Sequence, residues 1–370
     1  PAAEYEGYTF VAWYLDTAGR NRVTPETIVA TAGDHTLYAY YIEAAGNVRA
    51  DRAAMHFGQE GVSPASGNVS FSVTDMVMNI PGLSHNMTRT YNSQNTAAAA
   101  MGRGWSFGFE GRCEVYDDGA IVYLPNGSAH VFLLNDGGYI GEGSRSRLER
   151  GADGGFVLTQ PDQVKYGFGA DGRLAYIADR HDNRTVTGYT DGRISSLTDP
   201  AGRVYRLDTD EAGRIVKITD PMDNSVSYAY SGQGLLIYAT NLLGGVTTYE
   251  YDGSGCLSRI IDPNGNIIQD FAYTADEQKD EAAGLTVTKC VDSYGGKKTY
   301  TYYPDENKTE ITDGTGRKWT YWYNSDMYVT EVQNPDGSIE KTEYAPQEEG
   351  CHYADIASET DEFGRKTTYT

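Results

Sequence analysis

The sequence contains few residues of the kinds that build catalytic and metal sites. Its four cysteines, Cys113, Cys256, Cys290 and Cys351, lie far apart, and none forms a CxxC pair. Cys351 alone has an adjacent histidine, His352, but neighbouring residues on a strand point to opposite faces and chelate a metal ion poorly. We therefore predict buried or free thiols and no metal site, and a cystine between neighbouring strands stays open.

The six histidines are equally sparse, and none lies in a recognisable nucleophile or metal motif. The segments "DTDEAG" and "DPNGN" resemble fragments of calcium-binding loops, but they lack the bidentate glutamate that ends an EF-hand loop, and a role as turns explains them. The glycine clusters lack the Lys-Ser/Thr pair of a phosphate-binding loop. These absences predict a chain that is not an enzyme and binds no cofactor.

Long apolar runs and an excess of basic charge are missing as well. No stretch approaches the roughly 20 apolar residues of a membrane-spanning helix. The chain carries 52 acidic residues against 30 lysines and arginines, a net charge of −22, which argues against nucleic acid and anionic membranes as partners. Residues 269–370 hold 21 acids and 10 bases, so half of the acidic excess lies there. We interpret this charge as a soluble, self-repelling surface.

The two ends of the chain suggest a segment of a longer protein. The sequence begins at Pro1 without an initiator methionine or a signal peptide, and it stops at Thr370 within a strand-like phrase. We therefore expect further sequence on both sides.

Glycine and tyrosine, in contrast, are abundant. There are 43 glycines, and 30 tyrosines stand against 10 phenylalanines. Tyrosine, threonine and valine favour strands, whereas glycine, aspartate and asparagine favour turns that need a positive φ. The composition predicts an all-β fold made of many short strands.

Two turn signals recur along the chain with one period. The glycines of successive first turns, and the polar residues that open successive second turns, are each spaced by 20 and then 21 residues. The glycines are Gly172, Gly192, Gly213, Gly234 and Gly255, and the polar residues are Asp179, Asp199, Asp220, Asn241 and Asp262. The second marker continues at Asp292, Asp313, Asn334 and Asp361. Two longer steps contain the acidic segments "TADEQKDEAAG" and "PQEEGCHY", which we expect to be extended loops at hairpin ends.

Each unit of about 21 residues therefore predicts two antiparallel strands and two turns. The first strand carries aromatic residues at alternate positions, which places each pair on one face. The pairs are Tyr228 and Tyr230, Tyr249 and Tyr251, Tyr300 and Tyr302, and Tyr321 and Tyr323. Repetition predicts antiparallel hairpins that form a curved or spiralling β-sheet, in which the tyrosines are structural rather than sugar-stacking.

These residues carry a resemblance to a known family. The phrases "YTDGRISSLTDPAGR" and "YEYDGSGCLSRIIDPNGN" resemble YD repeats, the units of Rhs proteins, wall-associated proteins and teneurins, and the likeness covers residues 167–370. The matching residues are Tyr251, Asp252, Gly255 and Leu257 in one unit, and Tyr189, Asp191, Gly192, Arg193 and Ile194 in another, where the turn is one residue shorter.

The segments before the repeats have resemblances of their own. Residues 68–166 resemble the β domain that precedes YD repeats in Rhs-type proteins, and residues 1–42 resemble part of the small B-repeat of Listeria internalins. Residues 43–67 read as a linker because they are rich in alanine, glycine and serine. The residues that carry the resemblances are Arg89, Thr90, Tyr91, Asn92, Ser93, Gly102, Gly104 and Trp105 in the first, and Tyr8, Phe10, Trp13, Tyr14, Val23, Thr24, Leu37 and Tyr38 in the second.

The resemblance implies a structural function. It implies that the YD repeats build a hollow β-shell that encloses or displays a C-terminal cargo, often a toxin domain, and we expect a bacterial protein that is secreted or displayed on the cell surface. The cargo is then the expected partner. A non-enzymatic adhesin that binds carbohydrate or a surface protein is the alternative, and an exposed cluster of Trp319, Trp322 and Tyr323 would favour it. The same rings packed inside the sheet would favour the shell.

Overall fold

The computed structural model describes residues 8–14, 22–23, 37–43, 61–78, 85–95, 99–117, 119–125, 128–135, 138–141, 146–275, 285–292, 294–324, 327–344 and 356–369. Regular structure in these residues is β, apart from one short 3-10 helix, Pro304–Glu306. The predicted all-β class is confirmed.

Three small antiparallel sheets precede the repeats. The first has the order β2-β1-β3, the second β4-β5-β6 and the third β10-β9-β8-β7. Their strands are β1 (Tyr8–Tyr14), β2 (Arg22–Val23), β3 (Tyr38–Glu43), β4 (Ser70–Met76), β5 (Met87–Asn92), β6 (Trp105–Phe107), β7 (Arg112–Tyr116), β8 (Gly119–Tyr123), β9 (Ala129–Asn135) and β10 (Gly138–Gly141).

The rest of the chain forms one sheet of 21 strands, each paired antiparallel with the next in sequence. Its end strands, β11 and β31, do not pair with each other in the described part of the chain, so the sheet is open. The strands are β11 (Arg147–Arg150), β12 (Phe156–Thr159), β13 (Lys165–Phe168), β14 (Leu174–Ala178), β15 (Arg184–Thr190), β16 (Arg193–Thr198), β17 (Val204–Thr209), β18 (Ile215–Thr219), β19 (Ser225–Tyr230), β20 (Leu236–Thr240), β21 (Val246–Tyr251), β22 (Leu257–Ile261), β23 (Ile267–Ala275), β24 (Leu285–Asp292), β25 (Lys297–Tyr303), β26 (Lys308–Asp313), β27 (Lys318–Tyr323), β28 (Val329–Gln333), β29 (Ile339–Tyr344), β30 (Ile356–Thr360) and β31 (Lys366–Thr368).

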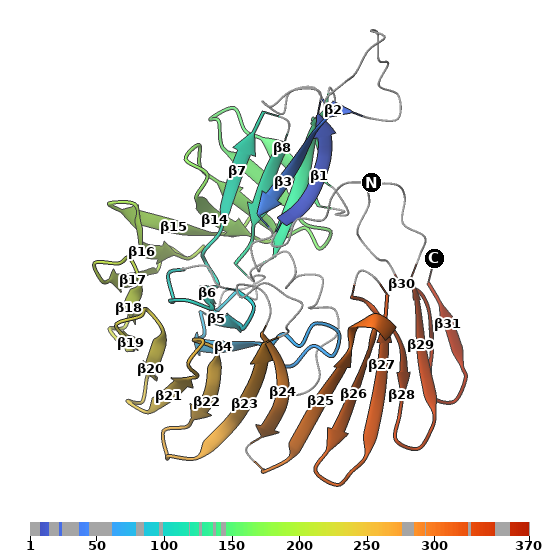
Figure 1. The fold of residues 1–370 in the computed structure, drawn as a ribbon. Helices are drawn as coiled ribbons and strands as arrows, with labels where there is room; N and C mark the ends of the chain where they lie inside the picture. The colour runs from blue at the N-terminus through green and yellow to red at the C-terminus, as the bar shows by residue number, and fades with distance from the viewer. Residues whose placement is uncertain are drawn as a thin grey trace, which may run out of the picture.

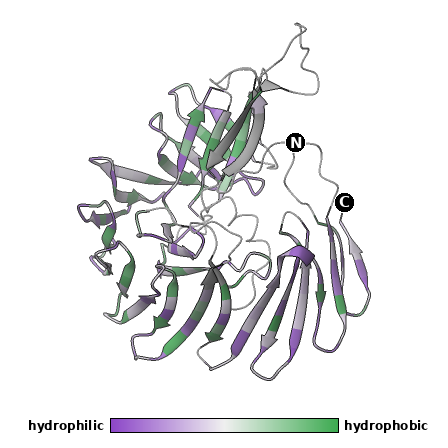
Figure 2. Cartoon of the chain, viewed as in Figure 1, coloured by the Kyte–Doolittle hydropathy of each residue, from purple (hydrophilic) through white to green (hydrophobic). Residues whose placement is uncertain are grey.

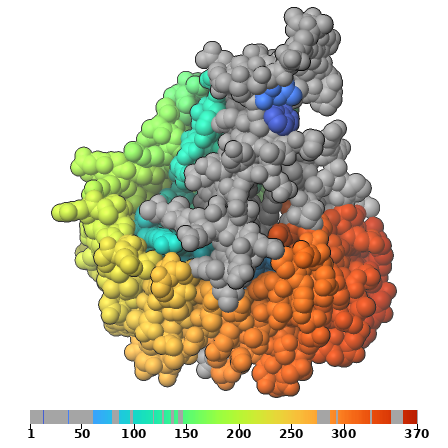
Figure 3. All heavy atoms as spheres, in the orientation of Figure 1, coloured from blue at the N-terminus to red at the C-terminus, as the bar shows by residue number. Residues whose placement is uncertain are grey.

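The long sheet curls around the second small sheet. Figure 1 shows strands β14 to β24 following a curve with β4, β5 and β6 on its concave side. In Figure 3 the yellow-to-red part of the chain forms one continuous outer wall. The main hydrophobic core lies between the two layers, because it joins residues of β4–β6, such as Trp105, to inward-facing residues of the repeats, such as Leu236 and Leu257.

Hydrophobic residues are unevenly distributed along this sheet. Figure 2 shows more green on strands β20 to β24 than on strands β29 to β31. The six residues of β29 are all exposed or half-buried, whereas β19 alternates half-buried and buried residues along its first four positions. The apolar face of the sheet is therefore strongest where the small sheet covers it.

Two boundaries expected from the sequence differ in the structure. Residues 61–67 were expected to lie in a linker, but Val62, Ser63 and Ala65 are buried and Val62 forms a β-bridge with Val69. Small residues here permit close backbone packing, which gives the composition of a linker without its exposure. The continuous sheet begins at Arg147, inside the segment assigned to the preceding domain.

Candidate functional site

The turns of the repeat share one set of hydrogen bonds. In the turn after β22, Asp262 Oδ1 accepts from the backbone nitrogens of Asn264 and Asn266, both at 2.8 Å. The side-chain nitrogen of Asn266 donates to Asp262 Oδ2 at 3.0 Å, and these donors lower the pKa of Asp262. Gly265 adopts a φ of +86°, which favours glycine. Hydrogen bonds within the turn therefore account for both carboxylate oxygens of Asp262.

The same turn recurs in both halves of the sheet. In each case an oxygen of the first residue accepts from the backbone nitrogens two and four positions later. These first residues are Asp179, Asp199, Asp220, Asn241, Asp252, Asp313 and Asp361. In the Asn334 turn, the backbone nitrogen of Asn334 donates to Ser338 O, and Gly337 N donates to Asn334 O. Asp292 ends β24, and its side chain lies outside the described residues.

The shortened unit has its own geometry. Thr190 pairs directly with Arg193, so Asp191 and Gly192 form a two-residue hairpin loop. Both have positive φ values, 49° and 77°, as a type I′ turn requires. The missing residue thus changes the turn type without changing the hairpin.

The tyrosine pairs face the concave side. The first members, Tyr228, Tyr249 and Tyr300, are buried, and the second members, Tyr230, Tyr251 and Tyr302, pack against the same core. In two of these strands a bulge precedes the second tyrosine, between Ala229 and Tyr230 and between Glu250 and Tyr251. Continuous burial along the concave face is the arrangement that the shell interpretation requires.

In six of the units, a tyrosine near the end of the first strand links two hairpins. Its hydroxyl donates to the carbonyl oxygen at the start of a strand in the preceding hairpin, 15 or 16 residues earlier. Tyr251, for example, donates to Leu236 O at 2.7 Å. The donors are Tyr189, Tyr230, Tyr251, Tyr273, Tyr302 and Tyr344. The fixed spacing was visible in the sequence, but the bond itself was not anticipated.

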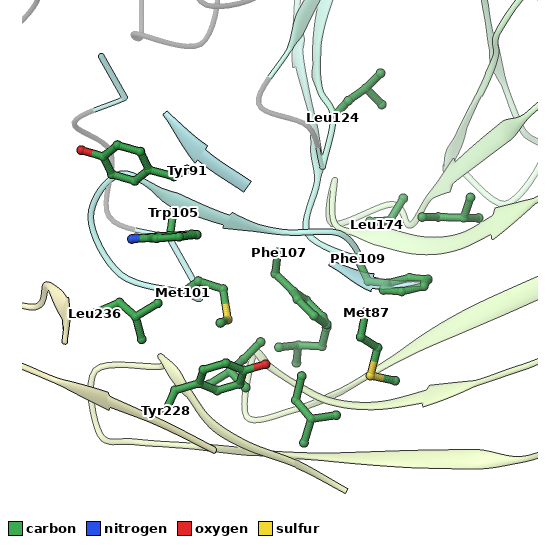
Figure 4. Packing of buried hydrophobic residues seen from close by; sticks show 14 of the residues in the cluster. Met87, Tyr91, Met101, Trp105, Phe107, Phe109, Leu124, Leu174, Tyr228 and Leu236 are labelled. Atoms are coloured by element: carbon green, nitrogen blue, oxygen red, sulfur yellow. The ribbon is translucent and has the colours of Figure 1, made fainter. Parts of the chain in front are cut away.

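The β4–β6 sheet is tied to the concave face by polar contacts as well as by packing. Trp105 Nε1 donates to Tyr251 Oη at 3.0 Å, and the backbone nitrogen of Leu257 donates to Tyr91 Oη at 2.9 Å. Figure 4 shows Trp105 and Tyr91 close together near Leu236. We call residues 61–117, which include this sheet, the inner module. The inner module packs against the concave face of the long sheet.

A buried ion pair lies at this interface. Arg89 Nε donates to Asp75 Oδ2 at 2.7 Å, and the Tyr228 hydroxyl donates to the same oxygen at 2.7 Å. The guanidinium lies 4.9 Å from the ring centre of Trp105 and 5.1 Å from that of Tyr249. Burial opposes the charge, but Tyr249 and Asp75 outweigh it and raise the pKa of Arg89. This cluster could not be predicted from the sequence, because its members lie far apart along the chain.

The described thiols are buried, whereas among the described imidazoles His85 and His130 are half-buried and His181 is exposed. Burial raises the pKa of Cys113 to about 12 and that of Cys256 to about 11, and it lowers the pKa values of His85 and His130. Cys113 and Cys256 form no disulfide, and Cys290 is also buried and accepts a hydrogen bond from the Gln269 side chain at 2.8 Å. Cys351 and His352 lie outside the described residues. The raised pKa values keep the Cys113 and Cys256 thiols protonated at neutral pH.

Two further kinds of feature are absent from the described residues. No cluster of three metal-ligating side chains occurs there. No helix in the described segments has the length and apolar character needed to cross a membrane.

The aromatic residues proposed for ligand binding do not form an exposed cluster. Tyr323 is buried, with 7% of its surface exposed. Trp319 and Trp322 are half-buried and lie three residues apart on β27, so they occupy opposite faces of the strand. The adhesin interpretation is therefore not favoured.

The fold and this lining define a class of protein, a hairpin-repeat wall curled around its own inner module. Three family models match the chain in the order expected from the sequence. The Listeria-Bacteroides repeat domain matches residues 1–40, a domain of unknown function (DUF6531) matches residues 59–132, and the Teneurin YD-shell matches residues 157–281. These matches confirm the resemblance to YD-repeat proteins that the sequence indicated, over the segments that the models cover.

Curated relatives agree with this assignment. The tRNA nuclease WapA of Bacillus subtilis strain 168 is 32% identical over 130 residues, which cover 34% of this chain and 6% of the relative. The tRNA3(Ser)-specific nuclease WapA of Bacillus spizizenii matches with the same identity and the same shares. The matched part is thus a small fraction of each relative.

Solved structures show only distant likenesses. The crystal structure of TcdB2-TccC3-Cdc42 has a TM-score of 0.35 at 10% identity, over 98% of this chain and 21% of that chain. The crystal structure of TcdB2-TccC3-TEV has a TM-score of 0.31 at 11% identity, over 80% and 21%.

Proposed function

We propose that the chain is a non-catalytic scaffold of a bacterial secreted or surface protein. It forms part of a β-shell that encloses or displays a C-terminal cargo domain, the expected partner. The observation that carries this proposal is the continuous 21-stranded sheet, whose tyrosine pairs and aliphatic residues are buried on the concave side. A hydrogen-bonded wall with few gaps between strands is suited to excluding solvent and proteases from what lies behind it.

The names of the curated relatives support a toxin cargo. Both matched WapA proteins are named as tRNA nucleases, and this chain matches only 6% of each. The inert thiols and the satisfied turn acids of the described residues fit a wall better than a nuclease. We therefore assign any nuclease activity of the whole protein to sequence outside this chain.

Protease protection tests this function. In the full-length protein, we expect the cargo to resist a protease that cleaves the isolated cargo. Ile218→Asp places a charge in the core of the wall, where Ile218 is fully buried, and should expose the cargo. Lys217→Asp changes the neighbouring exposed residue on the outer face and should leave protection intact. Cleavage of the cargo at the same rate in the intact protein and in isolation would refute enclosure.

A further inference from the structure

The long sheet poses a problem of register for the inner module. Its units repeat about every 21 residues, so its concave face offers equivalent groups to the inner module at each step. A shift of the inner module by one unit would place it on another such set of groups. A feature that differs between units is therefore needed to fix where the inner module docks.

Backbone N–H groups are among these repeated docking groups. Ile215 and Leu257 begin β18 and β22, each beside a bulge of the preceding strand. Ile215 N donates to Ala100 O at 2.7 Å, and Leu257 N donates to Tyr91 Oη at 2.9 Å. Leu174, which begins β14, donates to another carbonyl of the inner module at 3.1 Å. Because the repeat supplies a strand start in each unit, these bonds hold the inner module without selecting a unit.

The residue that follows the glycine of each first turn, in contrast, differs between units. It is arginine in three successive units and an uncharged residue in the next two. These residues are Arg173, Arg193, Arg214, Leu235 and Cys256. The last two are buried. The missing arginines therefore mark one part of an otherwise regular array.

Each repeat arginine lies against the first turn of the next unit. Arg214 Nη1 lies 3.3 Å from the position that a Cβ would take on Gly234. Arg193 Nη1 donates to Asp210 O, in the next first turn, at 3.0 Å. Arg173 lies in the same way against the turn that follows it. In these units a guanidinium from the repeat itself covers the turn glycine.

The unit of Leu235 breaks this pattern, and the inner module completes it. Leu235 brings only a methyl group, Cδ2, to 3.9 Å from the Cβ position of Gly255 in the next first turn. Arg103 Nη1 of the inner module lies 3.1 Å from that position, the distance that Arg173 Nη2 keeps at Gly192. Arg103 and Arg173 are both exposed, so both guanidiniums lie at the rim of the sheet. A guanidinium from outside the repeat thus stands where the repeat lacks one.

The backbone that carries Arg103 is seated on the preceding first turn. Arg103 N donates to Gly234 O at 3.3 Å. A Cβ on Gly102 would lie 2.5 Å from Gly234 O and 3.1 Å from the Tyr230 ring, so the approach is as close as the backbone permits. An arginine in place of Leu235 would send its guanidinium to the place that Arg103 occupies, and the two like charges would exclude each other.

We propose that Arg103 replaces the missing repeat arginine and prevents the inner module from docking one unit nearer to β11. The turn at Gly255 receives Arg103 because Leu235 leaves that place to it, whereas repeat arginines fill the corresponding place in three earlier turns. Arg103 is thus a positioning residue, and its partner is the protein's own repeat array. This inference concerns how the two layers assemble and does not depend on the proposed function.

A double-substitution cycle on the 370-residue chain tests the proposal, with amide hydrogen exchange at Ile215 and Leu257 as the measure of docking. Leu235→Arg restores the repeat arginine and should displace Arg103, so exchange of both amides should become about tenfold faster or more. Arg103→Leu alone should accelerate it about threefold. In the double variant the restored arginine takes the place of Arg103, so exchange should return to about the rate of Arg103→Leu alone.

Two controls separate docking from other effects. Leu243→Arg adds the same charge at a turn residue that is 95% exposed, and it should leave every exchange rate unchanged. The amides of β28–β31 serve as an internal reference, and their exchange should stay the same in all four variants. Faster exchange there as well as at Ile215 would mean general unfolding of the sheet and would count against a role in docking.

Several outcomes would overturn the proposal. If the double variant exchanges as fast as Leu235→Arg, then Leu235 matters only as a buried apolar residue. Unchanged exchange in Arg103→Leu would show that Arg103 does not position the inner module. If Leu235→Arg fails to fold, far-ultraviolet circular dichroism decides, because the proposal requires the double variant to regain the β signal. A double variant that also stays unfolded would refute it.

Discussion

Two regions of the sheet share one repeat but differ in what covers it. In β13–β24, which we call the covered hairpins, the concave face packs on the inner module, and Tyr228 and Tyr249 are 6% and 3% exposed. In β25–β31, the later hairpins, burial declines until every residue of β31 is exposed. In β29 the position of the first tyrosine is occupied by Thr342, which is half-buried.

The same kinds of hydrogen bond, in contrast, recur in both regions. Tyr251 donates to Leu236 O at 2.7 Å in the covered hairpins, and Tyr344 donates to Val329 O at 2.8 Å in the later ones. The aspartate turns at Asp262 and Asp361 make the same backbone contacts. The repeat therefore fixes hairpin geometry locally, whereas stability depends on a second layer that the repeat does not supply.

The largest difference between the regions is expected from removing a tryptophan. Trp105 is fully buried between the inner module and the sheet, so Trp105→Ala should lower the free energy of unfolding by about 3–5 kcal/mol. Trp319→Ala, in the later hairpins, removes a half-buried ring and should cost about 1–2 kcal/mol. Urea unfolding of both variants measures the contrast.

Amide hydrogen exchange identifies the strands that the Trp105→Ala substitution destabilises. Trp105→Ala should accelerate amide exchange in β19–β22 before it affects β28–β31. Equal acceleration in both regions would mean that the sheet unfolds as one unit and that the covered and later hairpins do not differ in stability.

A turn glycine gives the next largest effect. Gly172 has a φ of +80°, and a Cβ there would lie 2.5 Å from the backbone oxygen of Cys113. Gly172→Ala should cost about 2–4 kcal/mol, since it adds this clash to the strain of the left-handed conformation. Gly337, with a φ of +88° and no atom within 4 Å, isolates the strain, so Gly337→Ala should cost about 1–2 kcal/mol. Thermal unfolding measures both variants, and an equal decrease in the melting temperature of Gly172→Ala and Gly337→Ala would argue against close packing of β7 on the Gly172 turn.

Removing one hydroxyl should have a smaller effect. Tyr251→Phe removes the donor to Leu236 O and the acceptor for Trp105 Nε1, and should cost about 1–3 kcal/mol. Tyr344→Phe removes a bond near solvent, where water can replace it, and should cost about 0.5–1 kcal/mol. Chemical denaturation resolves the two values, and a larger loss for Tyr344 would reverse the assigned order of burial.

The sequence predicted the parts of this structure that are set by neighbouring residues. The 21-residue period and the tyrosine pairs anticipated hairpins because turn type and strand alternation depend on a few adjacent positions. The Asp75–Tyr228 contact joins residues 153 positions apart, and the place of Arg103 beside Gly255 depends on the same docking. Trp319, Trp322 and Tyr323 were grouped by proximity in sequence, but alternation and a bulge after Trp322 separate them in space.

The smallest expected effect on stability is that of lowering the pH, and it should be similar in the covered and the later hairpins. Hydrogen bonds lower the pKa values of Asp262, led by the Asn266 side chain, and of Asp361, led by the Arg365 backbone, below the usual 3.8. A lowered pKa in the folded state stabilises the fold above the unfolded value and loses that effect as the pH falls through the folded value. The urea concentration at the unfolding midpoint should therefore decrease as the pH is lowered from about 5 to about 2.

Asparagine already opens one of these turns, at Asn241, so it provides a mild test. Asp262→Asn and Asp361→Asn should each flatten the acid dependence by a similar small amount, because both turns keep their backbone contacts while each loses a titrating group and its charge on the Asn266 or Arg365 side chain. Glu110 works in the opposite direction, since burial raises its pKa and acid favours its folded form, but it is one group against several turn aspartates. If the acid dependence became flatter in only one of the two variants, the titration of the turn aspartates would depend on whether the inner module packs on that part of the sheet. The turns would then not be independent of the second layer.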